Sequence, residues 1–197
     1  ARRYGQLIET EGRRLTDMVE EVLEFAGLSG NRRPLALRPA DLPSLIAEVI
    51  AAHQPQLDGA GLQVEVEAPD ALAPIMADEE ALRRALSNLV GNAIKYAADG
   101  RWLRVSLRRE DHDPPTITLE VADHGPGITS DAAAHDFEPF YRGRHAVDQQ
   151  IHGNGLGLSL VARIAEAHGG TVAVSETPGG GATFSLRIPA VDVPAHD

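Results

Sequence analysis

The sequence predicts an α/β (α+β) domain, a two-layer sandwich in which a mixed sheet packs on helices, preceded by an N-terminal amphipathic helix. Three observations lead to this prediction. Helical and strand patterns alternate along the 197 residues. The last strands are joined by short glycine turns such as residues 178–181, which suit antiparallel pairing. Neither a dinucleotide fingerprint nor a Walker P-loop occurs, so a doubly wound Rossmann sheet is not expected.

Composition and charge exclude several classes of protein. Hydrophobic residues make up 43% of the chain and aromatic residues only 4%, so the core must be aliphatic. The net charge of −11 argues against nucleic acid as a partner. The absence of cysteine excludes disulfides and thiolate metal sites. No signal peptide or membrane-spanning apolar run is visible. We therefore expect a cytoplasmic location, with any anchoring in the inner membrane confined to segments of a parent protein outside this chain.

The chain divides into a helical segment, a linker, a main domain and a tail, at residues 1–30, 31–40, 41–190 and 191–197. Residues 3–28 carry apolar side chains at spacings of three and four, as in an amphipathic helix. This helix is either a surface helix of the main domain or the second helix of a dimerisation hairpin. The hairpin is favoured because a lone helix cannot bury so long a stripe.

Caps, periodicity and turn residues place the elements of the main domain. Aspartates precede two helical patterns and serve as N-caps, while alternating apolar and polar residues mark the strands. A stretch at about 124–154 has no sustained periodicity, which is typical of a functional loop or lid. The expected elements are a helix after Asp41, strands at about 62–67 and 74–76, a helix from Asp78 to about 98, strands at about 102–108 and 116–122, a helix at about 155–168, and strands at about 171–176 and 182–188.

One helix carries a polar stripe that suits a ligand. At 100° per residue, Asn88, Asn92 and Lys95 fall within about 60° of one another, while leucines occupy a different face. An asparagine supplies a neutral oxygen that Mg²⁺ accepts, and a lysine supplies a point charge for phosphate. Taken alone, the same stripe is equally explained by a solvated helix face.

Two glycine-rich segments favour a nucleotide. Asp123 ends a strand, where a buried carboxylate can accept the exocyclic amine of adenine. The glycines after it allow the backbone to turn closely, although an ordinary Asp-Gly turn has the same sequence. A second glycine set precedes the next helix, whose free N–H groups suit phosphate. The glycines concerned are Gly125 and Gly127 in the first segment and Gly153, Gly155 and Gly157 in the second.

The order and spacing of four motifs resemble the N, G1, F and G2 boxes of the catalytic ATP-binding domain of sensor histidine kinases. They lie at 88–96, 123–128, 137–142 and 153–158, and the likeness covers about residues 40–190, with a weaker likeness to the N-terminus. The resemblance implies the Bergerat ATP-binding fold and a Mg-ATP site for phosphoryl transfer to a histidine. It also implies that residues 41–190 form the catalytic domain and residues 1–30 the second helix of the dimerisation and phosphotransfer hairpin.

The resemblance also assigns roles residue by residue. Asn92 would bind Mg²⁺ and Lys95 would approach the phosphates, and these two are the expected catalytic residues. Asn88 would lie near the metal and Tyr96 near the adenosine. The aromatic residues of the third motif, Phe137, Phe140 and Tyr141, would anchor a lid from which Arg142 and Arg144 reach the triphosphate. The remaining expected nucleotide contacts are Asp123, Gly125, Gly127, Ile128, Gly153, Gly155, Leu156, Gly157, Leu158 and Thr183, the last through water.

The family's acceptor motif is not present in this sequence. In these kinases the phosphorylated histidine is followed by an acidic residue, within a motif like His-Glu-x-Arg-x-Pro, and none of the eight histidines fits. The acceptor helix is therefore expected to precede residue 1. The implied partners are ATP, the chain's own dimerisation helix, a second protomer and a response regulator. Two alternatives stay open: an ATPase or conformational switch of the wider GHKL superfamily, where a glutamate stands at the position of Asn88, and a nucleotide-binding module without transfer activity.

Overall fold

The structure, a computed structural model, describes residues 34–69, 72–97, 100–111, 113–128, 135–141 and 155–193, together with three positions near the N-terminus. Those three, Gly5, Gly12 and Val19, are helical, in agreement with the predicted N-terminal helix. The rest of that helix lies outside the described residues, as do Arg142, Arg144 and Gly153.

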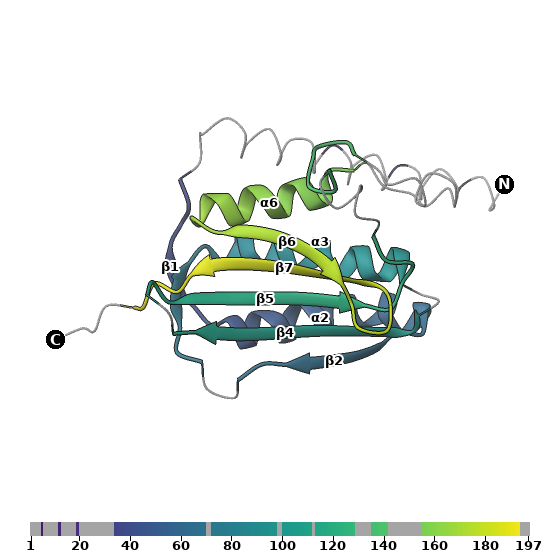
Figure 1. Cartoon of the computed structure of the whole chain (residues 1–197), viewed down its shortest axis with the longest axis horizontal. Coiled ribbons are helices and arrows are strands. Elements are labelled where there is room, and N and C mark those ends of the chain that lie inside the picture. Colours follow the sequence, from purple (N-terminus) through teal and green to yellow (C-terminus); the bar gives the residue numbers. More distant parts are fainter. Residues whose placement is uncertain are drawn as a thin grey trace.

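A mixed sheet of five strands in the order β2-β4-β5-β7-β6 forms one layer (Figure 1). The edge strand β2 runs parallel to β4, and the other neighbours pair antiparallel, as the short glycine turns predict. The strands are β2 (Gln63–Glu67), β4 (Trp102–Glu110), β5 (Thr116–Asp123), β6 (Thr171–Glu176) and β7 (Ala182–Pro189).

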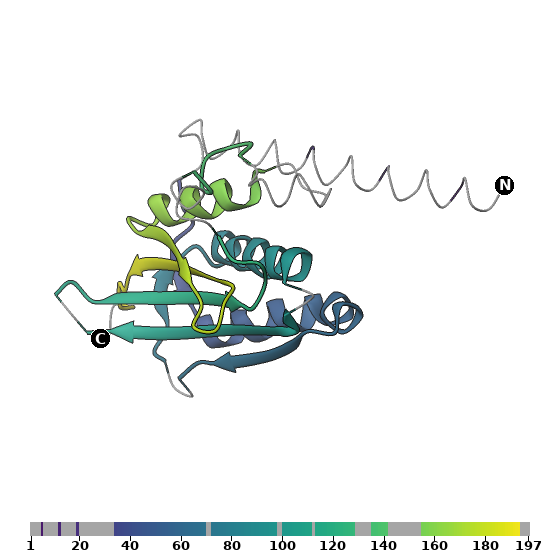
Figure 2. The same cartoon turned by 45° about the vertical axis from the view of Figure 1, so that its right-hand side comes forward.

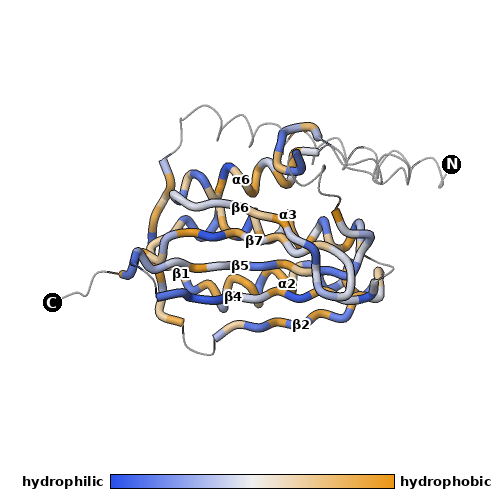
Figure 3. The backbone as a smooth tube through the Cα atoms, viewed as in Figure 1, coloured by the Kyte–Doolittle hydropathy of each residue, from blue (hydrophilic) through white to orange (hydrophobic). Residues whose placement is uncertain are grey.

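Three helices, α2 (Leu42–Ala60), α3 (Glu79–Tyr96) and α6 (Gly157–Ala167), form the second layer. They lie on one face of the sheet, and no described element covers the other face (Figures 1 and 2). Polar and apolar residues alternate along the strands and helices (Figure 3), which lets each element bury one side. The predicted two-layer sandwich is therefore confirmed.

The central helix α3 follows its sequence signals closely. Asp78 caps its first turn by accepting the N–H of Ala81 at 3.1 Å. Lys95 lies in the last turn, where a cation suits the helix dipole. The leucines and the alanine predicted to face the core are all buried, with 2% exposure or less: Leu82, Leu86, Leu89 and Ala93.

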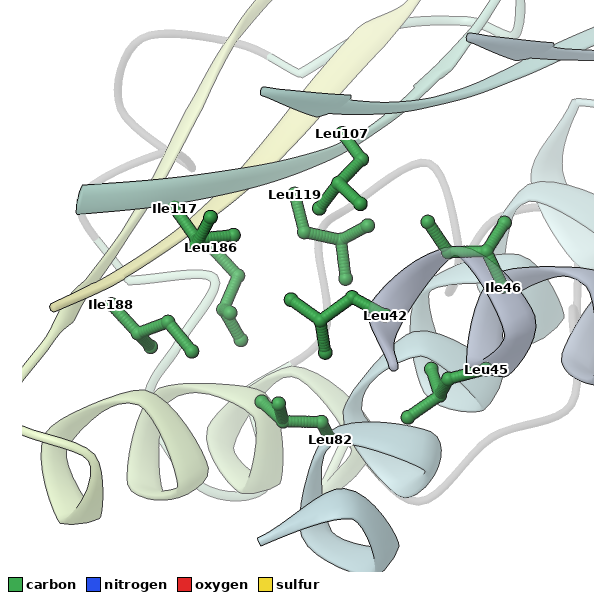
Figure 4. Close-up of a pocket in the computed structure, with 9 residues that line it drawn as sticks. All are labelled: Leu42, Leu45, Ile46, Leu82, Leu107, Ile117, Leu119, Leu186 and Ile188. Atoms are coloured by element: carbon green, nitrogen blue, oxygen red, sulfur yellow. The ribbon is translucent and has the colours of Figure 1, made fainter. Parts of the chain in front are cut away.

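The core between the layers is mainly aliphatic and contains a small cavity. It measures about 10 Å³, roughly the volume that one water needs. Figure 4 shows its lining side chains converging from both layers: Leu42, Leu45, Ile46, Leu82, Leu107, Ile117, Leu119, Leu186 and Ile188. With no polar group to hold water or a ligand, this cavity is a packing gap of the core and has no part in the site described below.

A second, two-stranded sheet includes residues from the segment expected as a linker before Asp41. Strand β1 (Arg38–Ala40) pairs antiparallel with β3 (Ile75–Ala77), and Asp192 adds a bridge to Ile75. Pro39 does not block the strand because β1 has a partner on one side only, the position in which a sheet tolerates proline. In the part of the chain that the structure describes, no helix is both long and apolar enough to cross a bilayer.

Candidate nucleotide-binding site

The polar stripe of α3 faces away from the core, as the helical spacing predicts. Asn88 and Asn92 are partly exposed and Lys95 is exposed. The amide of Asn88 is held in place, because its Nδ2 donates to the carbonyl of Arg84 at 3.0 Å. The other end of that amide meets α6: a Cβ on Gly157 would lie 2.9 Å from Asn88 Oδ1. The stripe therefore borders the start of α6, and a residue larger than glycine at position 157 would require the Asn88 amide to move.

The carboxyl of Asp123 lies at the buried end of β5, with only 5% of the residue exposed. Its Oδ1 accepts the backbone N–H of Gly125 at 2.8 Å and that of Ala182 at 3.3 Å. Burial raises the pKa of this carboxyl above its ordinary value, and the two backbone hydrogen bonds oppose that shift without cancelling it. A hydrogen bond donated by a ligand would stabilise the charged form of so deeply buried a carboxylate.

The glycines after Asp123 bring the loop against two other segments. A Cβ on Gly125 would lie 3.0 Å from the carbonyl oxygen of Tyr96, at the end of α3. Gly127 has φ +74° and a Cβ there would lie 3.3 Å from the carbonyl oxygen of Gly181, in the β6–β7 turn. Ile128 then packs against the core. The loop thus runs between the end of α3 and that turn.

The base of the predicted lid is held at two points. The N–H of Phe140 donates to the carbonyl of Gly155 at 3.0 Å, and Gly155 has φ +71° with no space for a Cβ beside Tyr141. Phe137 packs edge-on against Phe184 of the core, with ring centroids 6.5 Å apart. The side chain of Phe137 therefore packs on the domain, as expected of an anchor. The side chain of Phe140 does not, because 66% of the residue is exposed; its backbone, with φ +64°, makes the bond to Gly155.

The start of α6 presents backbone groups to the same region. Leu156 occupies the N-cap position and makes no side-chain capping bond, so the first N–H groups of the helix are not satisfied by a cap. The side chain of Leu156 is 1% exposed, and Leu158 packs against the core. Any contact of Leu156 with a nucleotide must therefore come from its backbone.

Thr183 lies on β7 beside β5, opposite Ala122, but its hydroxyl is already engaged. Its Oγ1 lies 2.9 Å from Oγ1 of Thr177, and both residues are buried. Sequence reasoning missed Thr177 and the backbone N–H of Ala182, because each depends on the pairing of β6 with β7. The glycine run before Ala182 is the only local signal: a Cβ on Gly181 would lie 1.9 Å from the carbonyl oxygen of Asp123.

These contacts bring three of the motifs and the base of the lid together at one end of the sandwich, on the right in Figure 1. Of the described residues, no group of three or more carboxylate, histidine or cysteine side chains could hold a metal ion. The amide oxygen of Asn92, on the exposed stripe of α3, could contribute to a magnesium site together with phosphate oxygens and water. Such a donor set suits Mg²⁺, which keeps several waters and binds substrate phosphates.

Comparison with known proteins identifies the family. The sequence profile of the family described as histidine kinase-, DNA gyrase B- and HSP90-like ATPase matches residues 77–192. The chain belongs to this family. Within it, the chain is similar along its whole length to sensor histidine kinases, and the resemblance drawn from the four motifs is confirmed.

Two curated relatives and one solved structure illustrate the similarity. The chain is 36% identical over 196 residues to the sensor-like histidine kinase SenX3 of Mycobacterium tuberculosis, covering 100% of this chain and 47% of SenX3. It is 36% identical over 192 residues to the signal transduction histidine-protein kinase AfsQ2 of Streptomyces coelicolor, covering 98% of this chain and 34% of AfsQ2. Full-length ShkA, solved in complex with AMPPNP, superposes with a TM-score of 0.83 at 34% identity, covering 98% of this chain and 40% of ShkA. The chain thus spans about half or less of these relatives, and it contains the catalytic ATP-binding domain of a sensor histidine kinase.

Proposed function

We propose that this chain is the catalytic part of a two-component sensor histidine kinase that binds Mg-ATP and transfers its γ-phosphoryl group to a histidine on a dimerisation helix outside the chain. The observation that carries the proposal is that the segments containing Asn88, Asp123 and Gly157 come together at one end of the sandwich. Burial of Asp123 beside two backbone donors supports recognition of an adenine amine.

Each residue has a distinct role in the proposal. Asp123 orients the base, and Tyr96 lies beside the adenosine. The backbone at Gly155 and Gly157, together with Lys95, binds the phosphates, and Arg142 joins them from the lid. Asn92 would hold magnesium, which supplies charge neutralisation at the phosphates when bound. Positioning the γ-phosphate for in-line attack by an imidazole is the main task left to the protein.

The environment of Asn88 favours transfer over hydrolysis. Its amide donates to Arg84 O and abuts Gly157, and an amide cannot act as a general base for water. In the alternative, a GHKL-type ATPase or switch, that position would carry a glutamate. A module that binds nucleotide without transfer is the other alternative, and the set Asn92, Lys95 and Asp123 argues against it.

Calorimetry with MgADP and MgGDP tests the site. We expect Asn92→Ala to weaken binding only when magnesium is present. Asp123→Asn should cost about tenfold to a hundredfold in ADP affinity and reduce the preference over GDP, because the amide presents a donor to the adenine amine. Asp58→Asn, on the exposed side of α2, is the matched control and should bind normally. Wild-type affinity in both site variants would refute the site.

Transfer from γ-labelled ATP tests the reaction. The chain alone should not acquire acid-labile phosphate and should release phosphate slowly, since no histidine in it has the neighbours of an acceptor. Adding an acceptor helix from the parent protein should allow labelling of that helix. Rapid phosphate release that Asn92→Ala abolishes would instead support the ATPase alternative.

A further inference from the structure

An aromatic pair lies next to Asp123 on the opposite side of the sheet. Trp102, the first residue of β4, stacks on His124 with ring centroids 4.3 Å apart and an angle of 26° between the planes. Leu103 pairs with Asp123 in the register of β4 and β5, so the stack occupies the next position along the two strands. Trp102 and Leu103 are successive residues of β4 and point to opposite faces of the sheet, so the stack on Trp102 lies on the face away from Leu103 and its partner Asp123.

The backbone on both sides of this stack is enclosed. A Cβ on Gly100 would lie 2.0 Å from the carbonyl oxygen of His124, and a Cβ on Gly181 would lie 2.7 Å from its Cα. A Cβ on Gly179, in the same turn as Gly181, would lie 3.9 Å from Nε2 of His124. The His124 residue is therefore confined between the turn before β4 and the turn before β7.

The confinement matters because His124 links the carboxyl of Asp123 to its main hydrogen-bond donor. The N–H of Gly125 donates to Asp123 Oδ1 at 2.8 Å, and the peptide that carries this N–H begins at His124. Rotation of that peptide would move the donor away from Oδ1 and change how the carboxyl is oriented.

We propose that His124 is a positioning residue for nucleotide binding. Its stack on Trp102 fixes the peptide between His124 and Gly125. The Gly125 N–H then donates to Oδ1 of Asp123, and the other carboxylate oxygen of Asp123 is directed to adenine. The inference rests on the proposed function, because it concerns the same site. It assigns a role to His124, which has no part in the proposed nucleotide contacts of the Asp123–Gly127 motif.

Two substitutions at His124 separate stacking from other properties of the side chain. His124→Ala removes the ring and should weaken MgADP binding about three- to tenfold, the value of an aromatic pair. His124→Phe keeps a ring that can stack and should stay within about twofold of wild type. His53→Ala, on α2 and away from the site, is the control and should not change affinity.

Two further readouts distinguish positioning from a general loss of stability. Hydrogen exchange at the Gly125 amide should rise in His124→Ala, while exchange at Asn92 within α3 should not. Trp102 is the only tryptophan in the chain, so its fluorescence should also report the loss of the stack. Trp102→Leu should also weaken MgADP binding, although it removes the contact of Arg104 with the ring, 5.4 Å from the ring centroid, as well as the stack. The loss in the double variant with His124→Ala should be smaller than the sum of the two single losses, because the stack is shared.

The outcomes discriminate between this inference and the function on which it rests. Unchanged affinity in His124→Ala, or equal losses in His124→Ala and His124→Phe, would overturn the positioning role and leave nucleotide binding intact. A wild-type protein that does not bind MgADP would overturn the proposed function, and the positioning role with it.

Discussion

The two ends of the sandwich each hold an aspartate, and the two are used in opposite ways. At the end where α3 begins and α6 ends, Asp78 joins three segments. Its Oδ2 accepts the N–H of Ala36 at 2.9 Å, its Oδ1 accepts that of Ala81 at 3.1 Å, and its own N–H donates to Nε2 of His168 at 3.1 Å. This residue therefore ties the segment before β1 to the start of α3 and the end of α6.

At the other end, Asp123 concentrates its hydrogen bonds on one oxygen. Gly125 and Ala182 both donate to Oδ1. Asp123 is 5% exposed and lies where the segments of three motifs meet. The carboxyl of Asp78 thus uses both oxygens within the fold, whereas we propose that the second oxygen of Asp123 serves the nucleotide.

The pKa values of the two carboxyls show what this difference costs. Burial favours a higher pKa for both. At Asp78 the backbone hydrogen bonds of Ala36 and Ala81 outweigh it, so the pKa is lowered and the charged form stabilises the fold. At Asp123 burial wins, the pKa is raised, and the charged form costs stability in the absence of a ligand. If Asp123 binds the nucleotide as proposed, binding should offset this cost.

The largest expected effect is at Asp78. An asparagine keeps one acceptor oxygen but turns an NH₂ group toward the other backbone N–H, so Asp78→Asn should lower the free energy of unfolding by about 2 kcal/mol. Urea unfolding followed by circular dichroism measures this. The control is Asp41→Asn, the N-cap of α2, where the second oxygen meets only the hydroxyl of Ser44, which can rotate. That variant should lose less than about 0.5 kcal/mol; equal losses would remove the special role of Asp78.

The next effect is at His168, which accepts the Asp78 N–H. His168→Ala should cost about 1–1.5 kcal/mol, because it leaves that N–H without its acceptor in a partly buried position. His53 is a matched control: its Nδ1 contacts the carbonyl of Val49 at 2.9 Å, as that of His168 contacts Ile164 at 2.8 Å, but it is not joined to Asp78. If His53→Ala is equally costly in urea unfolding, the link through Nε2 adds nothing.

The same two ends explain how far the sequence could be read. Asp78 and Asp41 were predicted as caps because an N-cap bond is local, spanning three residues. Strand β1 was not predicted: residues 38–40 contain a proline and lack periodicity, and they form a strand only because β3, far along the chain, offers an edge. The bond from Ala36 to Asp78 spans 42 residues and has no local signal.

At the end that holds the proposed nucleotide site, the sequence predicted the individual motifs but not the contacts between them. The resemblance located Asn88, Asp123 and Gly157, and the structure brings their segments together. The stack of Trp102 on His124 depends on the register of β4 with β5, which sequence periodicity does not fix across two separate strands. Phe140 was expected to be buried because it is aromatic, but its side chain is exposed. The backbone conformation at this position, with φ +64°, could not be predicted from the sequence.

A smaller effect of opposite sign is expected at Asp123. Its Oδ1 bonds survive in Asp123→Asn, and the cost of a buried charge is removed, so the nucleotide-free protein should gain about 0.5 kcal/mol. Thermal unfolding without and with MgADP measures both halves of the trade. Saturating MgADP should stabilise the wild type more than the variant, because stabilisation follows affinity. A variant less stable than wild type without nucleotide would show that Asp123 also supports the fold.

The smallest differences are expected in acid. There the stability lost in Asp78→Asn and the stability gained in Asp123→Asn should both shrink toward zero. The stabilisation from Asp78 is fully present above the ordinary aspartate pKa of 3.8 and is lost as the pH falls through its lowered pKa in the folded state. The penalty from Asp123 is fully present above its raised pKa and is already gone when the pH reaches 3.8. On acidification, the gain in Asp123→Asn should therefore disappear first and the loss in Asp78→Asn second. Urea unfolding of wild type and both variants at successively lower pH, starting from about pH 7, checks this order. Once the pH is below the lowered pKa of Asp78, each variant should lie within about 0.5 kcal/mol of wild type. If the stability difference between wild type and Asp78→Asn disappeared at a higher pH than that of Asp123→Asn, the assignment of Asp78 to the fold and of Asp123 to the site would be wrong.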